Sequence, residues 1–166
     1  MAPETHLLES LRMLSGSRTV ILGIGNTLKG DDGVGPSVCE RLRGRISTQV
    51  IDAGTVPENH IARIARLRPD NLLVIDAMDF AADPGTIRLF DPSDIPSVAL
   101  STHTLSPRLF VDLLRREAEV AVRFLAVQPS HTQFAAPLSE AVQGAVEVLA
   151  DLLGQVFPPA SEEPAP

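Results

Sequence analysis

The sequence has little cysteine, a deficit of basic residues and no long hydrophobic run. Cys39 is the single cysteine among 166 residues, which excludes an intramolecular disulfide bond and a zinc site built from several thiolates. The formal net charge of -7 argues against a nucleic-acid or anionic-membrane partner. No apolar run approaches the ~20 residues that span a bilayer, and residues 1–6 carry no basic stretch typical of a signal peptide. We therefore expect a protein of the reducing cytoplasm, without membrane insertion.

The length and composition suit one domain. With 44% hydrophobic residues, a chain of this length can bury a substantial core without a second domain. We predict a single α/β domain over residues 18–156. Residues 1–17 are predicted to be an appendage with a short amphipathic helix over 5–15, and residues 157–166, rich in proline and glutamate, a disordered tail.

Alternating strand and helix patterns predict the fold. The run at 71–76 contains a continuous apolar stretch, Leu72 to Ile75, as in a central strand covered on both faces. A turn signal at 83–85 and alternation over 86–90 predict a hairpin partner that runs antiparallel. The order of elements predicts a three-layer α/β/α sandwich around a mixed, mostly parallel five-stranded sheet. The expected strands are 19–24, 48–53, 71–76, 86–90 and 120–127, and the expected later helices are 34–43, one from 57, 107–116 and 138–153.

A glycine-rich loop after the first strand leads to two adjacent carboxylates. Gly25 and Gly30 have the spacing of a P-loop, but Asp31 and Asp32 stand where that loop needs a lysine and a hydroxyl. Leu28 stands where a dinucleotide fingerprint needs its third glycine. Two carboxylates about 4 Å apart repel by about 4 kcal/mol at an effective dielectric constant near 20, a cost that a bound cation offsets. The alternative is that Asp32 caps the next helix and Asp31 is solvated.

Acidic and histidine side chains follow several of the predicted strands. In parallel sheets the loops at the carboxyl ends of the strands meet at one edge, where ligands bind. Two carboxylates and one imidazole there, with positions left open for water or substrate, suit a divalent transition metal. The candidates are Asp31, Asp32, Asp52, Asp76, Asp79, His103 and His131.

Each candidate also has a structural explanation. Asp76 could simply cap the turn that closes its strand, and Asp52 and Asp79 suit hydrogen bonds from loop N–H groups. His103 lies among serine and threonine residues that could cap the next helix, and it reaches the edge by a longer route. His131 is a reserve candidate at the same edge.

Several motifs in order resemble the hydrogenase maturation endopeptidases. They lie at residues 23–35, 52–58, 74–79 and 101–103, and the resemblance runs from about residue 19 to residue 153. Within that family, the Asp-Asp-Gly form of the glycine loop and the Pro-Glu-Asn at 57–59 are most similar to the hydrogenase 3 maturation branch.

The resemblance implies an endopeptidase that removes a C-terminal extension from the large-subunit precursor of a nickel–iron hydrogenase after nickel insertion. By motif position, the residues that contact the metal and serve catalysis in the family correspond to Asp32, Asp76 and His103. Two aspartates and one imidazole suit nickel, which the substrate itself is expected to supply, and other divalent metals fit the same ligands. Other branches carry glutamate at the first position, so Asp32 has a shorter reach.

The resemblance leaves the roles of the metal and of Asp31 open. The metal either takes part in hydrolysis or only marks a loaded precursor. Asp31 either orients Asp32, acts as a base for the attacking water, or is solvated. The alternatives to a protease are a non-catalytic nickel- or precursor-binding maturation factor and a small-molecule metallohydrolase. We expect a monomer, because an enzyme that trims a larger subunit needs its crevice exposed.

Overall fold

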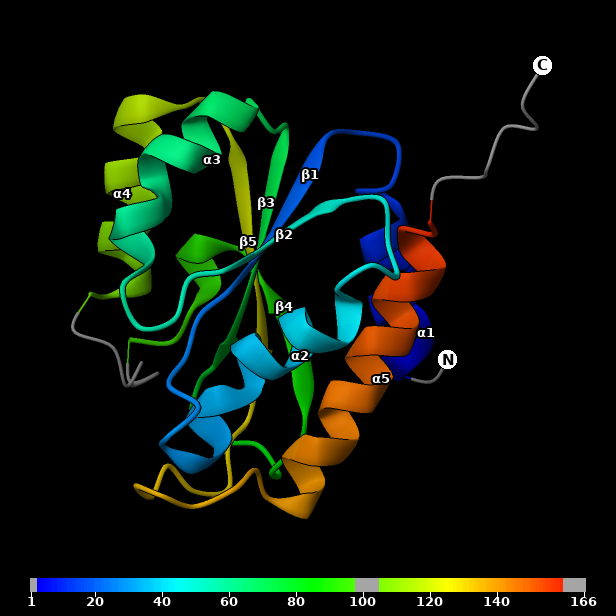
Figure 1. The fold of residues 1–166 in the computed structure, drawn as a ribbon, viewed down its shortest axis with the longest axis vertical. Coiled ribbons are helices and arrows are strands. Elements are labelled where there is room, and N and C mark those ends of the chain that lie inside the picture. Colours follow the sequence, from blue (N-terminus) through cyan, green and yellow to red (C-terminus); the bar gives the residue numbers. More distant parts are fainter. Residues whose placement is uncertain (1–2, 98–104, 160–166) are drawn as a thin grey trace.

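A five-stranded sheet lies between two layers of helices (Figure 1). The computed structural model describes residues 3–97 and 105–159. The order of strands across the sheet is β2-β1-β3-β5-β4, and all neighbours run parallel except β4 and β5. The predicted three-layer sandwich is confirmed. The strands are β1 (Thr19–Gly23), β2 (Gln49–Asp52), β3 (Asn71–Ala77), β4 (Ile87–Phe90) and β5 (Ala121–Val127).

The helices divide between the two faces of the sheet. In Figure 1, α1, α2 and α5 lie over one face and α3 and α4 over the other, in agreement with the two hydrophobic clusters of the core. Within the described ranges, no helix is long and apolar enough to cross a bilayer. The α-helices are α1 (Pro3–Arg12), α2 (Val34–Leu42), α3 (Ile61–Leu67), α4 (Pro107–Glu117) and α5 (Glu140–Val156), and short 3₁₀ helices are η1 (Gly30–Gly33), η2 (Pro57–His60) and η3 (Pro92–Asp94).

Strand β3 is the centre of the sheet, as its continuous apolar sequence predicts. Leu73 and Ile75 pack in the cluster with α2 and α5, while Leu72 and Val74 pack in the cluster with α3 and α4. Successive side chains of a strand point to opposite faces, so burial on both faces favours consecutive apolar residues, here Leu72 to Ile75. The two layers of helices cover these residues.

Strand β4 is antiparallel as predicted, but it is not the hairpin partner of the strand before it. β5 pairs with β3 along its whole length and lies between β3 and β4, with Ile87 opposite Val127. The alternation over 86–90 reports exposure of one face and says nothing about the pairing partner. The longer apolar strand β5 therefore pairs with β3, on the side away from β1.

The boundaries of the core extend beyond the predicted domain at both ends. Leu11 and Leu14 are buried in the cluster that contains the apolar face of α5, so the predicted appendage covers that helix. Phe157 is also buried there, and the N–H of Ser47 donates to the carbonyl of Pro158 at 3.3 Å. The rest of the predicted tail, residues 160–166, lies outside the described residues.

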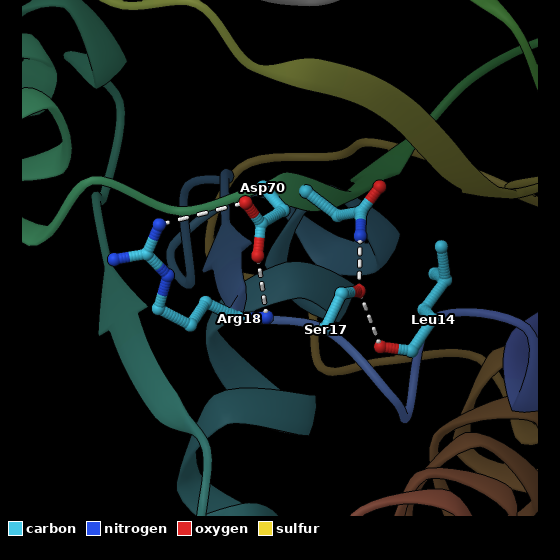
Figure 2. A network of polar contacts seen from close by, with 5 residues as sticks. Leu14, Ser17, Arg18 and Asp70 are labelled. Atoms are coloured by element: carbon cyan, nitrogen blue, oxygen red, sulfur yellow. Dashed lines mark hydrogen bonds and ion pairs between the residues drawn. The ribbon is translucent and has the colours of Figure 1, made fainter.

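A polar network at the amino edge of the sheet joins the end of the N-terminal segment to β1 and β3 (Figure 2). The amide of Asn71 donates to the Ser17 hydroxyl at 2.6 Å, which donates to the Leu14 carbonyl at 3.0 Å. The carboxylate of Asp70 accepts the main-chain N–H of Arg18 at 2.9 Å, and the guanidinium lies 3.5 Å from its other oxygen. Both charged side chains remain more than half exposed, so the ion pair itself is weak.

Replacing Asp70 by asparagine should lower the thermal midpoint at neutral pH, and the difference from wild type should vanish in acid. The N–H of Arg18, and then its guanidinium, hold the pKa of Asp70 below its ordinary value. A carboxyl group of this kind stabilises the fold above the unfolded pKa of about 3.9, and the effect is lost as the pH falls through the lower native pKa. Thermal melts from about pH 2 to pH 7 measure this difference.

The control is Arg18→Ala, which removes the guanidinium but keeps the main-chain N–H. The thermal midpoint of this variant should keep most of its wild-type dependence on pH. Loss of that dependence in Arg18→Ala would show that the ion pair, and not the main-chain hydrogen bond, causes the stabilisation by Asp70.

Candidate functional site

The glycine loop between β1 and α2 folds back tightly on the turn that carries the two aspartates. A Cβ atom added at Gly25, where φ is +154°, would lie 1.9 Å from the carbonyl oxygen of Asp32. A Cβ added at Gly35 would lie 2.3 Å from the carbonyl oxygen of Ile24. Only glycine allows both approaches. The loop therefore closes over η1 and buries its two carboxylates.

Asp31 is fully buried and accepts four hydrogen bonds from the segment after β5. Its Oδ2 accepts the N–H groups of Ser130 and His131 at 2.8 and 3.2 Å and the Ser139 hydroxyl at 2.8 Å, and its Oδ1 accepts the Ser139 N–H at 2.6 Å. Burial alone would raise the pKa of Asp31, but hydrogen bonds from Ser139, Ser130 and His131 outweigh burial and hold it below its ordinary value. The alternative in which Asp31 is solvated is therefore wrong.

Asp32 is 1% exposed, and its side chain turns back into the glycine loop. Its Oδ2 accepts the N–H of Asn26 at 2.9 Å. The residue that caps α2 is Gly33, without a side-chain hydrogen bond. The alternative in which Asp32 serves as the cap of this helix is therefore wrong.

Asp76 is 2% exposed and lies within β3, one residue before the strand ends. Its side chain lines a cavity of about 10 Å³ together with Ile24, Pro57, Pro107 and Phe110, among others. The start of α4 therefore lies beside Asp76, at the same edge of the sheet as Asp32.

His103 lies outside the described residues, so the structure does not test the predicted set of Asp32, Asp76 and His103. Helix α4 begins after Ser106, whose hydroxyl accepts the N–H of Leu109 at 3.2 Å. The cap is thus not one of the residues beside His103. Across residues 3–97 and 105–159, no group of three histidine, cysteine, aspartate or glutamate side chains is placed to hold a metal ion.

Comparison with known proteins decides the family. The profile of the hydrogenase maturation protease family matches residues 36–155. The chain is 37% identical over 133 residues to the hydrogenase 3 maturation protease of Escherichia coli, covering 78% of this chain and 85% of that protein. The chain belongs to the hydrogenase maturation protease family. The resemblance drawn from the motifs is confirmed.

Solved structures of hydrogenase maturation proteases agree with this assignment. The crystal structure of the [NiFe] hydrogenase maturation protease HycI from Thermococcus kodakarensis matches with a TM-score of 0.79 at 32% identity, covering 89% of this chain and 97% of that one. The solution structure of the endopeptidase HycI from Escherichia coli matches with a TM-score of 0.72 at 36% identity, covering 88% and 99%. The α/β fold is thus that of the family.

Two other aspartates at this edge have the structural roles that their sequence context suggests. Asp52 is exposed and accepts the N–H of Gly54 at 3.0 Å. Asp79 accepts the N–H of Ala81 at 3.1 Å and the side-chain amide of Gln128 at 3.1 Å. These bonds hold the pKa of Asp79 below its ordinary value. Both aspartates shape their own loops.

Sequence reasoning missed two residues that organise the segment after β5. Gln128 is buried, and its side-chain oxygen Oε1 accepts the N–H groups of Phe80 and Ala82 at 2.9 and 3.3 Å. Ser139 binds Asp31 and also caps α5 by accepting the N–H of Val142 at 3.4 Å. A serine directly before an apolar helical pattern is a cap signal, which could have identified Ser139. No sequence signal marks Gln128.

His131, the reserve candidate, belongs to the hydrogen-bonded shell of Asp31 through its main chain. Its imidazole packs against Gly30, where an added Cβ would lie 2.6 Å from Nδ1. That nitrogen is buried and has no hydrogen-bond partner among the described residues. The packing of His131 fixes the position of the loop; the structure does not place it in a ligand set.

Large apolar side chains are exposed around this edge of the family fold. Leu28 in the glycine loop is 59% exposed and Phe134 in the segment after β5 is 75% exposed. The N–H of Ala135 donates to the carbonyl of Leu28 at 2.7 Å, so the two loops are joined. Val56 and Leu109, beside Pro57 and Pro107 of the Asp76 cavity, are also exposed.

Replacing Gly25 by alanine should destabilise the protein by about 2–4 kcal/mol, because the new methyl group would overlap the Asp32 carbonyl and force the loop open. The matched control is Gly144→Ala in α5, where an added Cβ meets nothing within 4 Å. That variant should be about 0.5–1 kcal/mol more stable than wild type, because alanine is the better helix former. Urea denaturation measures both, and equal stabilities of the two variants would contradict the tight approach at Gly25.

Proposed function

We propose that this protein is an endopeptidase that removes the C-terminal extension of a nickel–iron hydrogenase large-subunit precursor after nickel insertion. The observation that carries the proposal is a pair of buried carboxylates in a member of this family: Asp32 in η1, after the loop that follows β1, and Asp76 near the end of the adjacent strand β3. Buried charges are retained where they are paired or coordinate metals.

The proposed ligands are Asp32, Asp76 and His103. Two carboxylates and an imidazole form a donor set that fits nickel, here part of the loaded substrate. When bound, the metal supplies Lewis-acid polarisation of the scissile carbonyl or serves as a tag for recognition. The chain's own part is to hold its ligands in fixed positions. The Asn26 N–H fixes Asp32, and the pairing of β3 between β1 and β5 fixes the backbone of Asp76.

The exposed surface at this edge favours a protein substrate. Exposed apolar side chains at a site are typical of surfaces that contact other proteins. The exposed Leu28 and Phe134 therefore suit contact with a folded precursor.

The working state that we propose is a monomer in the cytoplasm, with the precursor as its partner. An open edge of the sheet suits this arrangement, because the precursor must bring its own metal centre and its extension to Asp32 and Asp76 together.

Mass spectrometry of a nickel-loaded large-subunit precursor tests this function. Wild type should release a C-terminal peptide from the loaded precursor and none from a nickel-free control. Asp32→Asn, Asp76→Asn and His103→Ala should each slow release by at least about 100-fold, the usual effect of removing one stabilising group at a reacting carbonyl. Asp52→Asn, an exposed carboxylate at the same edge, is the matched control and should cleave at the wild-type rate.

Full trimming by all three site variants would remove these residues from the mechanism. A stable complex between wild type and the loaded precursor, without release of peptide, would favour a non-catalytic binding factor.

Replacing Leu28 or Phe134 by serine should weaken precursor binding, because each removes exposed apolar surface next to the site. We expect KM to rise about tenfold with kcat unchanged, since a central apolar contact is worth about 1–2 kcal/mol. Steady-state cleavage assays measure both constants. Met13→Ser is the control, because Met13 is 81% exposed but follows α1 at the opposite edge. An unchanged KM in both loop variants would exclude this docking role.

A further inference from the structure

We propose that Asp31 is a positioning residue for the site: by binding the segment after β5, it fixes the orientation of the turn that carries Asp32. For its effect on catalysis, this inference rests on the proposed function. Its effect on geometry is independent of that function.

The two adjacent carboxylates point to different partners. The Asp31 carboxylate accepts hydrogen bonds from residues near the end of β5 and the start of α5, namely Ser130, His131 and Ser139. Asp32 accepts the N–H of Asn26 from the glycine loop. Because the residues are neighbours in one four-residue turn, η1, a rotation of this turn moves both side chains.

The turn itself is short and begins at a glycine in the left-handed region, Gly30 with φ +54°. Glycine places little restriction on the backbone, so contacts from outside must set the orientation of the turn. Two main-chain bonds contribute: Gly30 N–H donates to Ala136 at 3.1 Å and Asp31 N–H donates to His131 at 3.0 Å. The Asp31 carboxylate adds four more and contacts both ends of the segment 130–139.

Ser139 extends this connection to a helix of the core. Its hydroxyl donates to Asp31 at 2.8 Å and accepts the N–H of Val142 at 3.4 Å. Helix α5 packs in turn on α2, which follows the aspartates directly. The orientation of η1 is therefore set from two sides, by α2 in sequence and by α5 through Ser139.

Only a carboxylate satisfies this arrangement. Both oxygens of Asp31 face donors, with main-chain N–H groups on each side. An asparagine in either rotamer would direct its NH₂ group at a main-chain N–H, which leaves buried donors unsatisfied. Asp31→Asn is consequently a near-isosteric change that removes the connection without altering the volume.

Amide hydrogen exchange of Asn26 reports on the position of Asp32, because its N–H donates to that side chain. Asp31→Asn should lose protection at Ser130 and Ser139 and also at Asn26, by about tenfold or more. With a nickel-loaded precursor, kcat should fall about 100-fold with KM nearly unchanged, since a misplacement of about 1 Å costs about that much. The measurement is made well below the thermal midpoint of the variant, so that the folded fraction is the same.

A second pair of variants covers the case in which Asp31→Asn does not fold. Ser139→Ala removes the hydroxyl bond to Asp31 and should lower both the Asn26 protection and kcat, and Ser139→Thr, which restores the hydroxyl, should recover both. Asp70→Asn removes a hydrogen-bonded carboxylate at the opposite edge and is the matched control. It should leave Asn26 protection and kcat at the wild-type values.

Wild-type Asn26 protection and wild-type kcat in folded Asp31→Asn would overturn the inference and leave the proposed function intact. Loss of Asn26 protection in Asp31→Asn, in a protein whose wild type releases no peptide, would support the positioning of Asp32 and reject the proposed function. A purely structural role predicts a lower thermal midpoint with unchanged Asn26 exchange, and this result would also overturn the inference.

Discussion

The buried carboxylate of Asp31 imposes a constraint that the rest of the site must meet. A charge removed from water costs several kcal/mol unless hydrogen bonds replace its hydration. Here Ser130, His131 and Ser139 supply that replacement. The segment after β5 therefore takes one conformation, which also places the first turn of α5 and joins the loop of Phe134 to that of Leu28. The arrangement of the loops at this edge therefore depends on the hydrogen bonds to Asp31.

Local sequence patterns predict the elements of this fold well and their partners less well. The apolar run of β3 indicates a strand buried on both faces because every one of its side chains must find a layer of helices. The alternation in β4 carries no such information about its neighbour, and it pairs with β5 rather than in a hairpin. Helix α1 is predicted from its leucine spacing, but the burial of Leu11 against α5 depends on tertiary packing.

In the site, too, local sequence patterns predict some features, and contacts between distant segments decide the others. The glycine loop predicts that Asp32 lies at the carboxyl edge, and the close approach of Gly25 accounts for its burial. The burial of Asp31 depends on hydrogen-bond donors about a hundred residues later in the chain, at Ser130 and Ser139. No sequence pattern near Asp31 indicates these donors. A carboxylate is usually exposed to solvent, but the N–H groups that converge on Asp31 stabilise it in a buried position. His103 stays a prediction, supported by its motif.

The long separation between Asp31 and Ser139 has a consequence for synthesis. Strands β1, β2 and β3 leave the ribosome before the residues that bind the Asp31 carboxylate have been made. The shell of Asp31 becomes available only when the residues before α5 have been made. A chain released before that point lacks the donors that replace the hydration of Asp31, so its glycine loop cannot close over that carboxylate and the turn that carries Asp32 has no fixed orientation.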